Sequence, residues 1–110
     1  MPFLDTRALA PKEPLPGWLG RFFHSESMTF GYYEVRAGAT IHEHEHPNEE
    51  VWHVLEGELE VTIAGETRVA GPGGVALVPP NTKHFVRALT DGRAIVVDQP
   101  RRARVGGVET

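Results

Sequence analysis

The chain of 110 residues contains no cysteine. This absence excludes disulfide bridges, thiolate metal ligands and cysteine nucleophiles together. Long apolar runs are absent too, and no stretch has the roughly 20 consecutive apolar residues that a transmembrane helix needs. The first residues also lack the apolar core of a secretory signal peptide. We therefore expect no membrane segment and a cytoplasmic location.

Positive charge is scarce. Lysine and arginine number 11 against 15 aspartate and glutamate residues, which gives a formal net charge of −4 at pH 7. A nucleic-acid-binding domain normally presents a basic stripe, so no nucleic-acid partner is expected. The one basic cluster consists of Arg101, Arg102 and Arg104, near the C-terminus. We interpret it as a solvated or interface-pinning end of the chain.

Helical periodicity is the third missing feature, because no window repeats its apolar residues with the helical period of about 3.6. Instead, short runs rich in aromatic and β-branched residues recur about every ten residues between turn signals. This pattern predicts an all-β sandwich or barrel. Ala64-Gly65 is one predicted turn, and Asp91-Gly92 carries the strongest hairpin signal of the chain. The predicted strands lie within residues 21–27, 28–38, 50–71, 75–80, 83–90 and 94–100.

The length of the chain allows one domain with one core. Residues 18–100 are predicted to form the barrel. Residues 1–17 are rich in proline and have no periodicity, which is typical of an extended arm that wraps a surface of its own chain or of a partner subunit. Residues 101–110 are predicted to form a C-terminal tail. Because of the arm, we expect a homodimer.

Alternating histidines and glutamates mark residues 38–57, GATIHEHEHPNEEVWHVLEG. Within them, His42, Glu43 and His46 match the HExxH pattern of zinc proteases, which requires two histidines one helical turn apart. We reject this match, because the β-branched residues before the tract and the proline after it favour an extended chain. A strand places residues i and i+2 on one face. His42, His44 and His46 are therefore predicted to point one way and the intervening glutamates the other.

Three imidazoles on one strand face are costly in a core unless their nitrogens gain partners, and a metal would supply one. Glu50 shares its predicted face with the apolar Trp52 and Val54, so we expect it to point inward. His84 follows a rigid proline turn and shares a face with apolar residues. Histidines together with a carboxylate are suited to a divalent iron, manganese, nickel, copper or zinc ion.

At these positions the chain resembles the cupin superfamily. The first cupin motif, G-x5-H-x-H-x3,4-E-x6-G, is filled at every place, by Gly38, His44, His46, Glu50 and Gly57. The resemblance therefore covers the whole histidine tract at the correct spacing.

The second cupin motif, G-x5-P-x-G-x2-H-x3-N, is matched in part. Gly73, Pro79 and His84 fit, whereas Asn81 replaces a glycine and Ala88 replaces the asparagine. Asparagine tolerates the left-handed backbone conformation that a glycine would supply, so the first departure is mild. The second departure removes no metal ligand.

The resemblance implies a double-stranded β-helix, the jelly-roll-like barrel of roughly six to eight strands. It also implies a metal near the mouth of the barrel, held by His44, His46, Glu50 and His84. Many small cupins form dimers through their outer sheets and exchanged N-terminal strands, which agrees with the expected homodimer.

Other residues near the predicted ligands are candidates for catalysis or binding. Glu50 and His42 could move protons, since His42 lies on the ligand face but outside the motif. Trp52 is expected to line a substrate pocket, because it shares the face of Glu50. Four arginines could each anchor a substrate carboxylate, and the sequence does not single one out. These are Arg21, Arg36, Arg87 and Arg93.

Two functions agree with these features. The leading hypothesis is a small metalloenzyme that acts as an isomerase, lyase or dioxygenase on an oxygen-rich small molecule, such as a sugar acid, a keto acid or a phenolic. The layout, including Asp98-x-Pro100-Arg101, is loosely similar to sugar-acid ring-opening proteins of pectin breakdown. The alternative is a non-catalytic small-molecule-binding or sensor cupin with a structural or absent metal. A regulatory role would need a separate chain, because no helix-turn-helix pattern is present.

Overall fold

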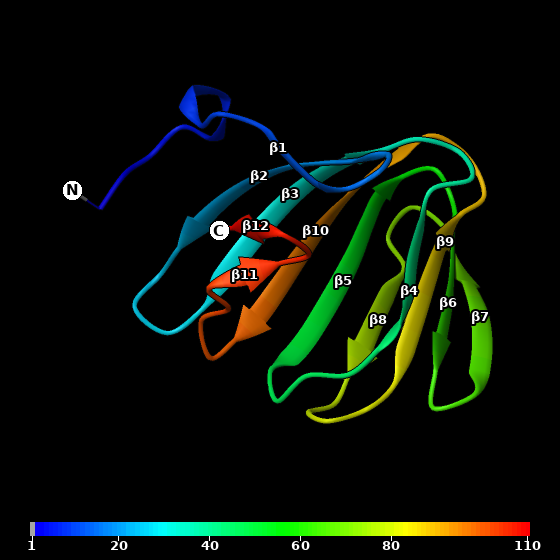
Figure 1. The fold of residues 1–110 in the computed structure, drawn as a ribbon. Coiled ribbons are helices and arrows are strands. Elements are labelled where there is room, and N and C mark those ends of the chain that lie inside the picture. The colour runs from blue at the N-terminus through cyan, green and yellow to red at the C-terminus, as the bar shows by residue number, and fades with distance from the viewer. Residues whose placement is uncertain (1) are drawn as a thin grey trace.

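The computed structural model describes residues 2–110, which form two antiparallel sheets packed around one core (Figure 1). The six-stranded sheet has the order β1 (Lys12–Leu15), β2 (Trp18–His24), β3 (Thr29–Val35), β10 (Gly92–Gln99), β5 (Glu49–Glu56), β8 (Val75–Val78). The four-stranded sheet has the order β4 (Thr40–His44), β9 (His84–Ala88), β6 (Leu59–Ile63), β7 (Glu66–Ala70). A separate hairpin joins β11 (Arg104–Val105) to β12 (Val108–Glu109), and a 3-10 helix spans Thr6–Ala8. The prediction of an all-β, jelly-roll-like barrel is confirmed.

The two turns predicted from the sequence make different connections. Ala64-Gly65 joins β6 to β7 in a hairpin, as predicted, with φ values of 49° and 82°. The hairpin prediction at Asp91-Gly92 is wrong, because β9 pairs with β4 and β6 whereas β10 pairs with β3 and β5. The turn instead crosses between sheets, where Asp91 Oδ1 accepts a 2.8 Å hydrogen bond from the Ala37 backbone N–H. A local turn signal therefore did not determine which strands pair.

Large and small residues alternate on the inner face of the six-stranded sheet. Gly20 is the cross-strand neighbour of Tyr33, and Gly31 is the neighbour of Phe22. A Cβ at either glycine would lie 2.9 Å from a ring carbon of Tyr33, so the missing side chains let the rings lie over the backbone. The buried aromatic cluster that results contains Phe22, Tyr33, Trp18 and Trp52.

The outer face of the six-stranded sheet carries an apolar row. One row of cross-strand neighbours runs over five strands and consists of Phe23, Phe30, Val97, Val51 and Leu77. Phe23 and Phe30 stack with ring centroids 4.8 Å apart, whereas Leu77 is 67% exposed. A sheet face turned to solvent normally carries polar residues. This row, called the outer apolar row below, is therefore typical of an interaction surface.

Both terminal segments pack against the barrel. Residues 12–15 of the predicted arm form β1, which pairs with β2 at the edge of the sheet. Residues 104–109 of the predicted tail form the β11–β12 hairpin, and Lys12 Nζ donates a 2.8 Å hydrogen bond to the Glu109 carbonyl oxygen. The hairpin therefore lies against β1. Within residues 2–110, no helix has the length and apolar character needed to cross a membrane.

Gly57, at the turn between β5 and β6, is expected to tolerate no side chain. Its φ is 78°, and a Cβ would collide with the Asp91 carbonyl oxygen and lie 2.7 Å from Thr90 Oγ1. Left-handed strain and overpacking together should lower the free energy of unfolding of Gly57→Ala by about 2–5 kcal/mol. Urea unfolding measures this loss.

Gly65→Ala is the matched control for this substitution. Gly65 has a φ of 82°, but a Cβ there would meet nothing within 4 Å. Only the left-handed strain remains, so the expected loss is about 1–2 kcal/mol. Equal losses in the two variants would contradict the role assigned to the Asp91 contact.

Candidate metal centre

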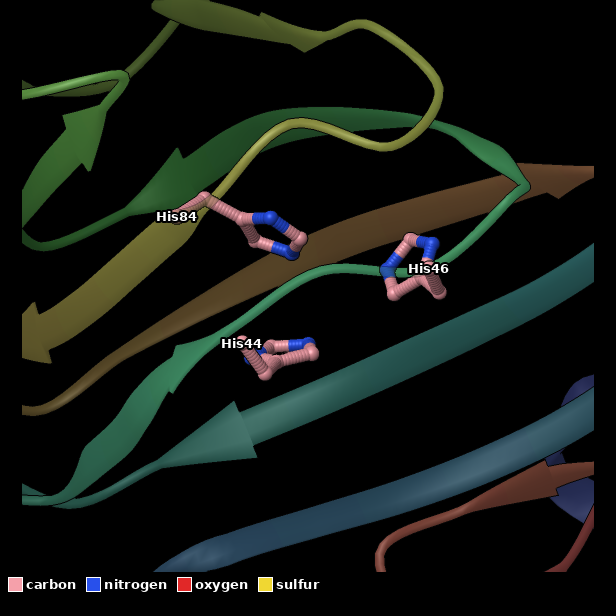
Figure 2. Close-up of side chains that lie close together, drawn as sticks. All are labelled: His44, His46 and His84. Carbon is pink, nitrogen blue, oxygen red and sulfur yellow. The ribbon is translucent and has the colours of Figure 1, made fainter.

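Three histidines of the β4 and β9 region converge at one end of the barrel (Figure 2). His44 ends β4, His84 begins β9, and the two are direct cross-strand neighbours with ring centroids 4.2 Å apart. His46 lies in the loop after β4, and its ring centroid is 5.0 Å from that of His84. The His46 carbonyl oxygen accepts a 2.8 Å hydrogen bond from the N–H of Asn81. Asn81 has a φ of 56°, the left-handed conformation that the sequence allowed for this position.

A strand irregularity decides which residues of β4 face inward. The register shifts between Ile41 and His44, so both side chains face the interior although they are three positions apart. His42 is exposed and lies at the rim, with its ring centroid 5.7 Å from that of His44. The strict alternation predicted for the tract is therefore interrupted, because a bulge adds a residue to one strand. The intervening glutamates, Glu43 and Glu45, are exposed, as the alternation predicts.

Each histidine ring is oriented by a hydrogen bond from its Nδ1 to a backbone carbonyl oxygen. A carbonyl oxygen only accepts, so Nδ1 carries a hydrogen and, in the neutral ring, Nε2 keeps a lone pair. This arrangement is typical of metal-ligating histidines, whose second nitrogen is held by an acceptor. The Nδ1 atoms of His44, His46 and His84 lie 2.8, 3.1 and 2.8 Å from the carbonyl oxygens of His42, Asn48 and Thr82, respectively.

Glu50, on β5, reaches the histidines from the six-stranded sheet. Its Oε1 lies 3.4 Å from His46 Nε2, and its Oε2 lies 3.2 Å from His84 Nε2. Both of these nitrogens are buried and have no hydrogen-bond partner within residues 2–110. Lone pairs that face a carboxylate repel it, and a proton or a metal cation between them removes the repulsion. This set of nitrogen and oxygen donors fits a transition metal ion.

Burial and neighbouring charges set the protonation of the centre. Burial alone would raise the pKa of Glu50, but close contacts with His46 and His84 and a hydrogen bond from Trp52 outweigh it and hold the pKa well below its usual value. Burial lowers the pKa of His44. Burial would also lower the pKa of His84, but proximity to Glu50 outweighs it and raises the pKa. Glu50 is therefore the ionised group around which the imidazoles are arranged.

Two charged residues that the sequence did not assign to the centre also belong to it. Asp98, on β10, is the cross-strand neighbour of Glu50 and is 4% exposed. Burial and the charge of Glu50 raise the pKa of the Asp98 carboxyl, and its Oδ1 has no hydrogen-bond partner within residues 2–110. Arg102 Nη1 donates a 3.1 Å hydrogen bond to Glu50 Oε1 and lies 3.8 Å from Asp98 Oδ2. The interpretation of Arg102 as part of a solvated end is therefore wrong.

A cavity of about 360 Å³ opens beside the centre. His44, Glu50 and Asp98 line it, and Trp52 does so too. The four arginines considered as carboxylate anchors do not line this cavity, whereas Arg102 does. Arg102 was missed because its place depends on how the chain turns back after β10, which no local pattern shows.

A family model described as the cupin domain matches residues 31–99. This chain belongs to the cupin family. An uncharacterized protein of Streptomyces coelicolor is 32% identical over 81 residues, which are 73% of this cupin and 77% of that protein. Among solved structures, KdgF from a Halomonas species has a TM-score of 0.86 and 26% identity over 93% of this chain and 96% of its own. An RmlC-like cupin from Shewanella frigidimarina has a TM-score of 0.86 and 23% identity over 93% of each chain, a likeness that shows the fold alone.

In this cupin the two family motifs meet at one place. The first motif contributes His44, His46 and Glu50, and the second contributes His84. The four-stranded sheet and the loop after β4 provide the imidazoles, whereas the six-stranded sheet provides the carboxylate. The described residues therefore contain a histidine and glutamate cluster that could hold a metal ion.

Proposed function

We propose that this cupin is a metal-dependent enzyme that acts on a small oxygen-rich molecule, such as a sugar acid, a keto acid or a phenolic. The observation that carries the proposal is the convergence of three histidines and one buried carboxylate beside a cavity, which His44 and Glu50 line. The assigned ligands are His44, His46, Glu50 and His84. A divalent iron, manganese, nickel, copper or zinc ion, when bound, supplies a Lewis acid for oxygen donors.

Arg102 is assigned to bind an anionic group of the substrate. Its guanidinium lies at the cavity wall, and its contacts with Glu50 and Asp98 both use Nη1. A guanidinium carries five N–H donors in a planar fork, so other donors remain for a carboxylate or phenolate. An acidic substrate agrees with this arrangement better than a neutral one.

Asp98 and His42 are assigned to proton transfer. Asp98 Oδ1 is buried beside the cavity with no hydrogen-bond partner among residues 2–110, and His42 lies at the rim. A carboxyl or imidazole within hydrogen-bond reach of a bound substrate can take a proton from it or return one, as isomerases and lyases require. Glu50, the other residue predicted for this role, is already engaged by Trp52 and Arg102. Asp98 therefore replaces Glu50 in the proposed mechanism.

Turnover tests this proposal. Protein loaded separately with iron(II), manganese(II), nickel(II) or zinc(II) is incubated with uronates, 2-keto acids, 1,3-diketones and catechols, and the products are followed by NMR. We expect conversion of at least one compound that stops when a chelator removes the metal. Metal-loaded protein that binds panel compounds but converts none would contradict catalysis and favour the alternative, a binding or sensor cupin.

We further propose that a second copy of this chain covers the outer apolar row. The row is aromatic at one end and aliphatic at the other, so two copies related by a twofold axis can pack sheet on sheet. Light scattering should give the mass of a dimer, and Leu77→Glu should reduce it to the 12.1 kDa of one chain. Leu89→Glu, at another exposed leucine outside the row, is the control. A wild-type monomer at micromolar concentration would contradict the dimer.

A further inference from the structure

Two neighbouring rows of the six-stranded sheet give the cavity two chemically different sides. One row is polar and consists of Glu50, Asp98 and Thr29. The next row is apolar and consists of Trp52, Val96, Gly31 and Phe22. Residues of both rows line the cavity. The rows are two positions apart along each strand, about 7 Å, so one small ligand can contact both.

The rings of Tyr33 and Phe22 lie over Gly31 on the apolar side. A Cβ at Gly31 would lie 2.9 Å from a ring carbon of Tyr33 and 3.1 Å from one of Phe22, so the two rings use the space that a side chain would fill, and both line the cavity. The two rings meet edge to face, with centroids 5.6 Å apart and planes at 86°. Aromatic rings prefer to contact other rings in such edge-to-face or offset arrangements. A planar group therefore fits the shape of this side.

Within residues 2–110, the polar side-chain groups on the apolar side are the Tyr33 hydroxyl and two indole N–H groups. The indole nitrogens of Trp52 and Trp18 already donate to Glu50 and to the Thr40 carbonyl oxygen. The covering wall is apolar as well, because β1 and the β11–β12 hairpin contribute Pro14, Leu15 and Val105. A ligand with hydroxyl groups all around its ring would lose hydrogen bonds to water here and find few partners in return. An aromatic ring has no such hydrogen bonds to lose.

We infer that the cavity selects a planar aromatic ring with adjacent oxygen groups, such as a hydroxybenzoate, over a polyhydroxylated sugar acid. The ring contacts the apolar row and Tyr33. The carboxylate or phenolate contacts the polar side, where Arg102 lies beside the metal ligands. This inference rests on the proposed function and narrows its substrate class to phenolic acids and their relatives.

Calorimetric titration of zinc-loaded protein, freed of excess metal, tests the selectivity. The probes are 2-hydroxybenzoate, benzoate and glucuronate. Both aromatic acids are expected to bind at least about tenfold more tightly than glucuronate, the discrimination that an apolar pocket provides. Glucuronate binding equally or more tightly would overturn the inference, and so would a failure of both aromatic acids to bind.

A second experiment changes the apolar side of the cavity by substitution. Gly31→Ala adds a methyl group that the rings of Tyr33 and Phe22 must move to admit, so the apolar side of the cavity changes shape. The substitution should weaken 2-hydroxybenzoate binding by at least about tenfold with unchanged zinc content. Gly71→Ala is the control, because a Cβ at Gly71 meets nothing within 4 Å and Gly71 does not line the cavity. Unchanged affinity in folded Gly31→Ala would overturn the placement of the ring.

Failure of the inference differs from failure of the proposed function. Protein that retains zinc but prefers glucuronate overturns the substrate class and leaves the metal centre in place. Protein that retains no metal overturns the proposed function. In that case the same titrations without metal still test the apolar side, and benzoate is expected to bind more tightly than glucuronate.

Discussion

Replacing His44 by alanine is expected to lower the affinity for a divalent transition metal at least ~100-fold while the barrel stays folded. Loss of a residue that merely orients a ligand already costs about 10–100-fold, and His44 is assigned as a ligand itself. Its side chain is only half-buried, so the substitution leaves a smaller void than at the buried His84. Competition with a chromogenic chelator measures the affinity, and circular dichroism checks the fold.

His53→Ala is the matched control for this experiment. His53 is exposed on β5, on the outer face of the six-stranded sheet, so the same change in composition should leave metal affinity unchanged. His84→Ala should lose the metal as His44→Ala does, with an additional loss of stability because His84 is 1% exposed. Full metal retention in folded His44→Ala would remove His44 from the ligand set.

Asp98→Asn is expected to lower kcat by about 10²- to 10⁴-fold, the usual contribution of a positioned acid or base, with metal content unchanged. The amide has nearly the same size as the carboxyl but cannot exchange a proton in the same way. The substitution should therefore remove chemistry without opening a cavity beside Glu50. Steady-state kinetics on a compound converted by the wild-type enzyme, together with elemental analysis, measures both quantities.

Asp91→Asn controls for the loss of a carboxylate elsewhere. Asp91 lies on an exposed turn, and its contact with the Ala37 N–H needs only an acceptor, which asparagine keeps. No change in kcat is expected. If Asp98→Asn lost metal in proportion to activity, Asp98 would be a ligand and not a proton-transfer residue. An unchanged kcat would exclude both roles.

The spacing of residues in the sequence predicted which histidines and which glutamate lie close together. Two histidines two positions apart, with a carboxylate four positions further on, lie at a strand end and at the start of the next strand, and the proline turn before His84 aims that residue at them. The prediction that Glu50 and Trp52 share the inward face of their strand also agreed with the structure, since both are buried. Spacing and side-chain alternation are local properties of an extended chain, so they can be read from the sequence.

Residues that depend on long-range chain paths were not predictable in this way. Asp98 is a partial exception, because it shares a face of β10 with Ala94 and Val96, so parity could have placed it inward although not beside Glu50. Arg102 reaches Glu50 only because the chain reverses beyond β10. The bulge in β4 and the crossover at Asp91-Gly92 likewise follow from how the two sheets pair and not from the turn residues themselves.

The fold also explains why the centre suits a cation. Imidazole nitrogens from one sheet and carboxylates from the other meet in a buried space, with Nε2 of His46 and His84 facing Glu50 and with Asp98 beside it. Arg102 neutralises part of this charge. A divalent cation would satisfy the remaining lone pairs and reduce the repulsion between the two carboxyl groups.

Elemental analysis of the protein, purified without chelators and then equilibrated with iron(II), manganese(II), nickel(II) and zinc(II) in turn, tests the metal centre most directly. The predicted result is about one tightly held transition metal ion per chain that survives gel filtration and is lost in His44→Ala. Folded wild-type protein that retains none of these ions would contradict the metal centre and the function proposed from it.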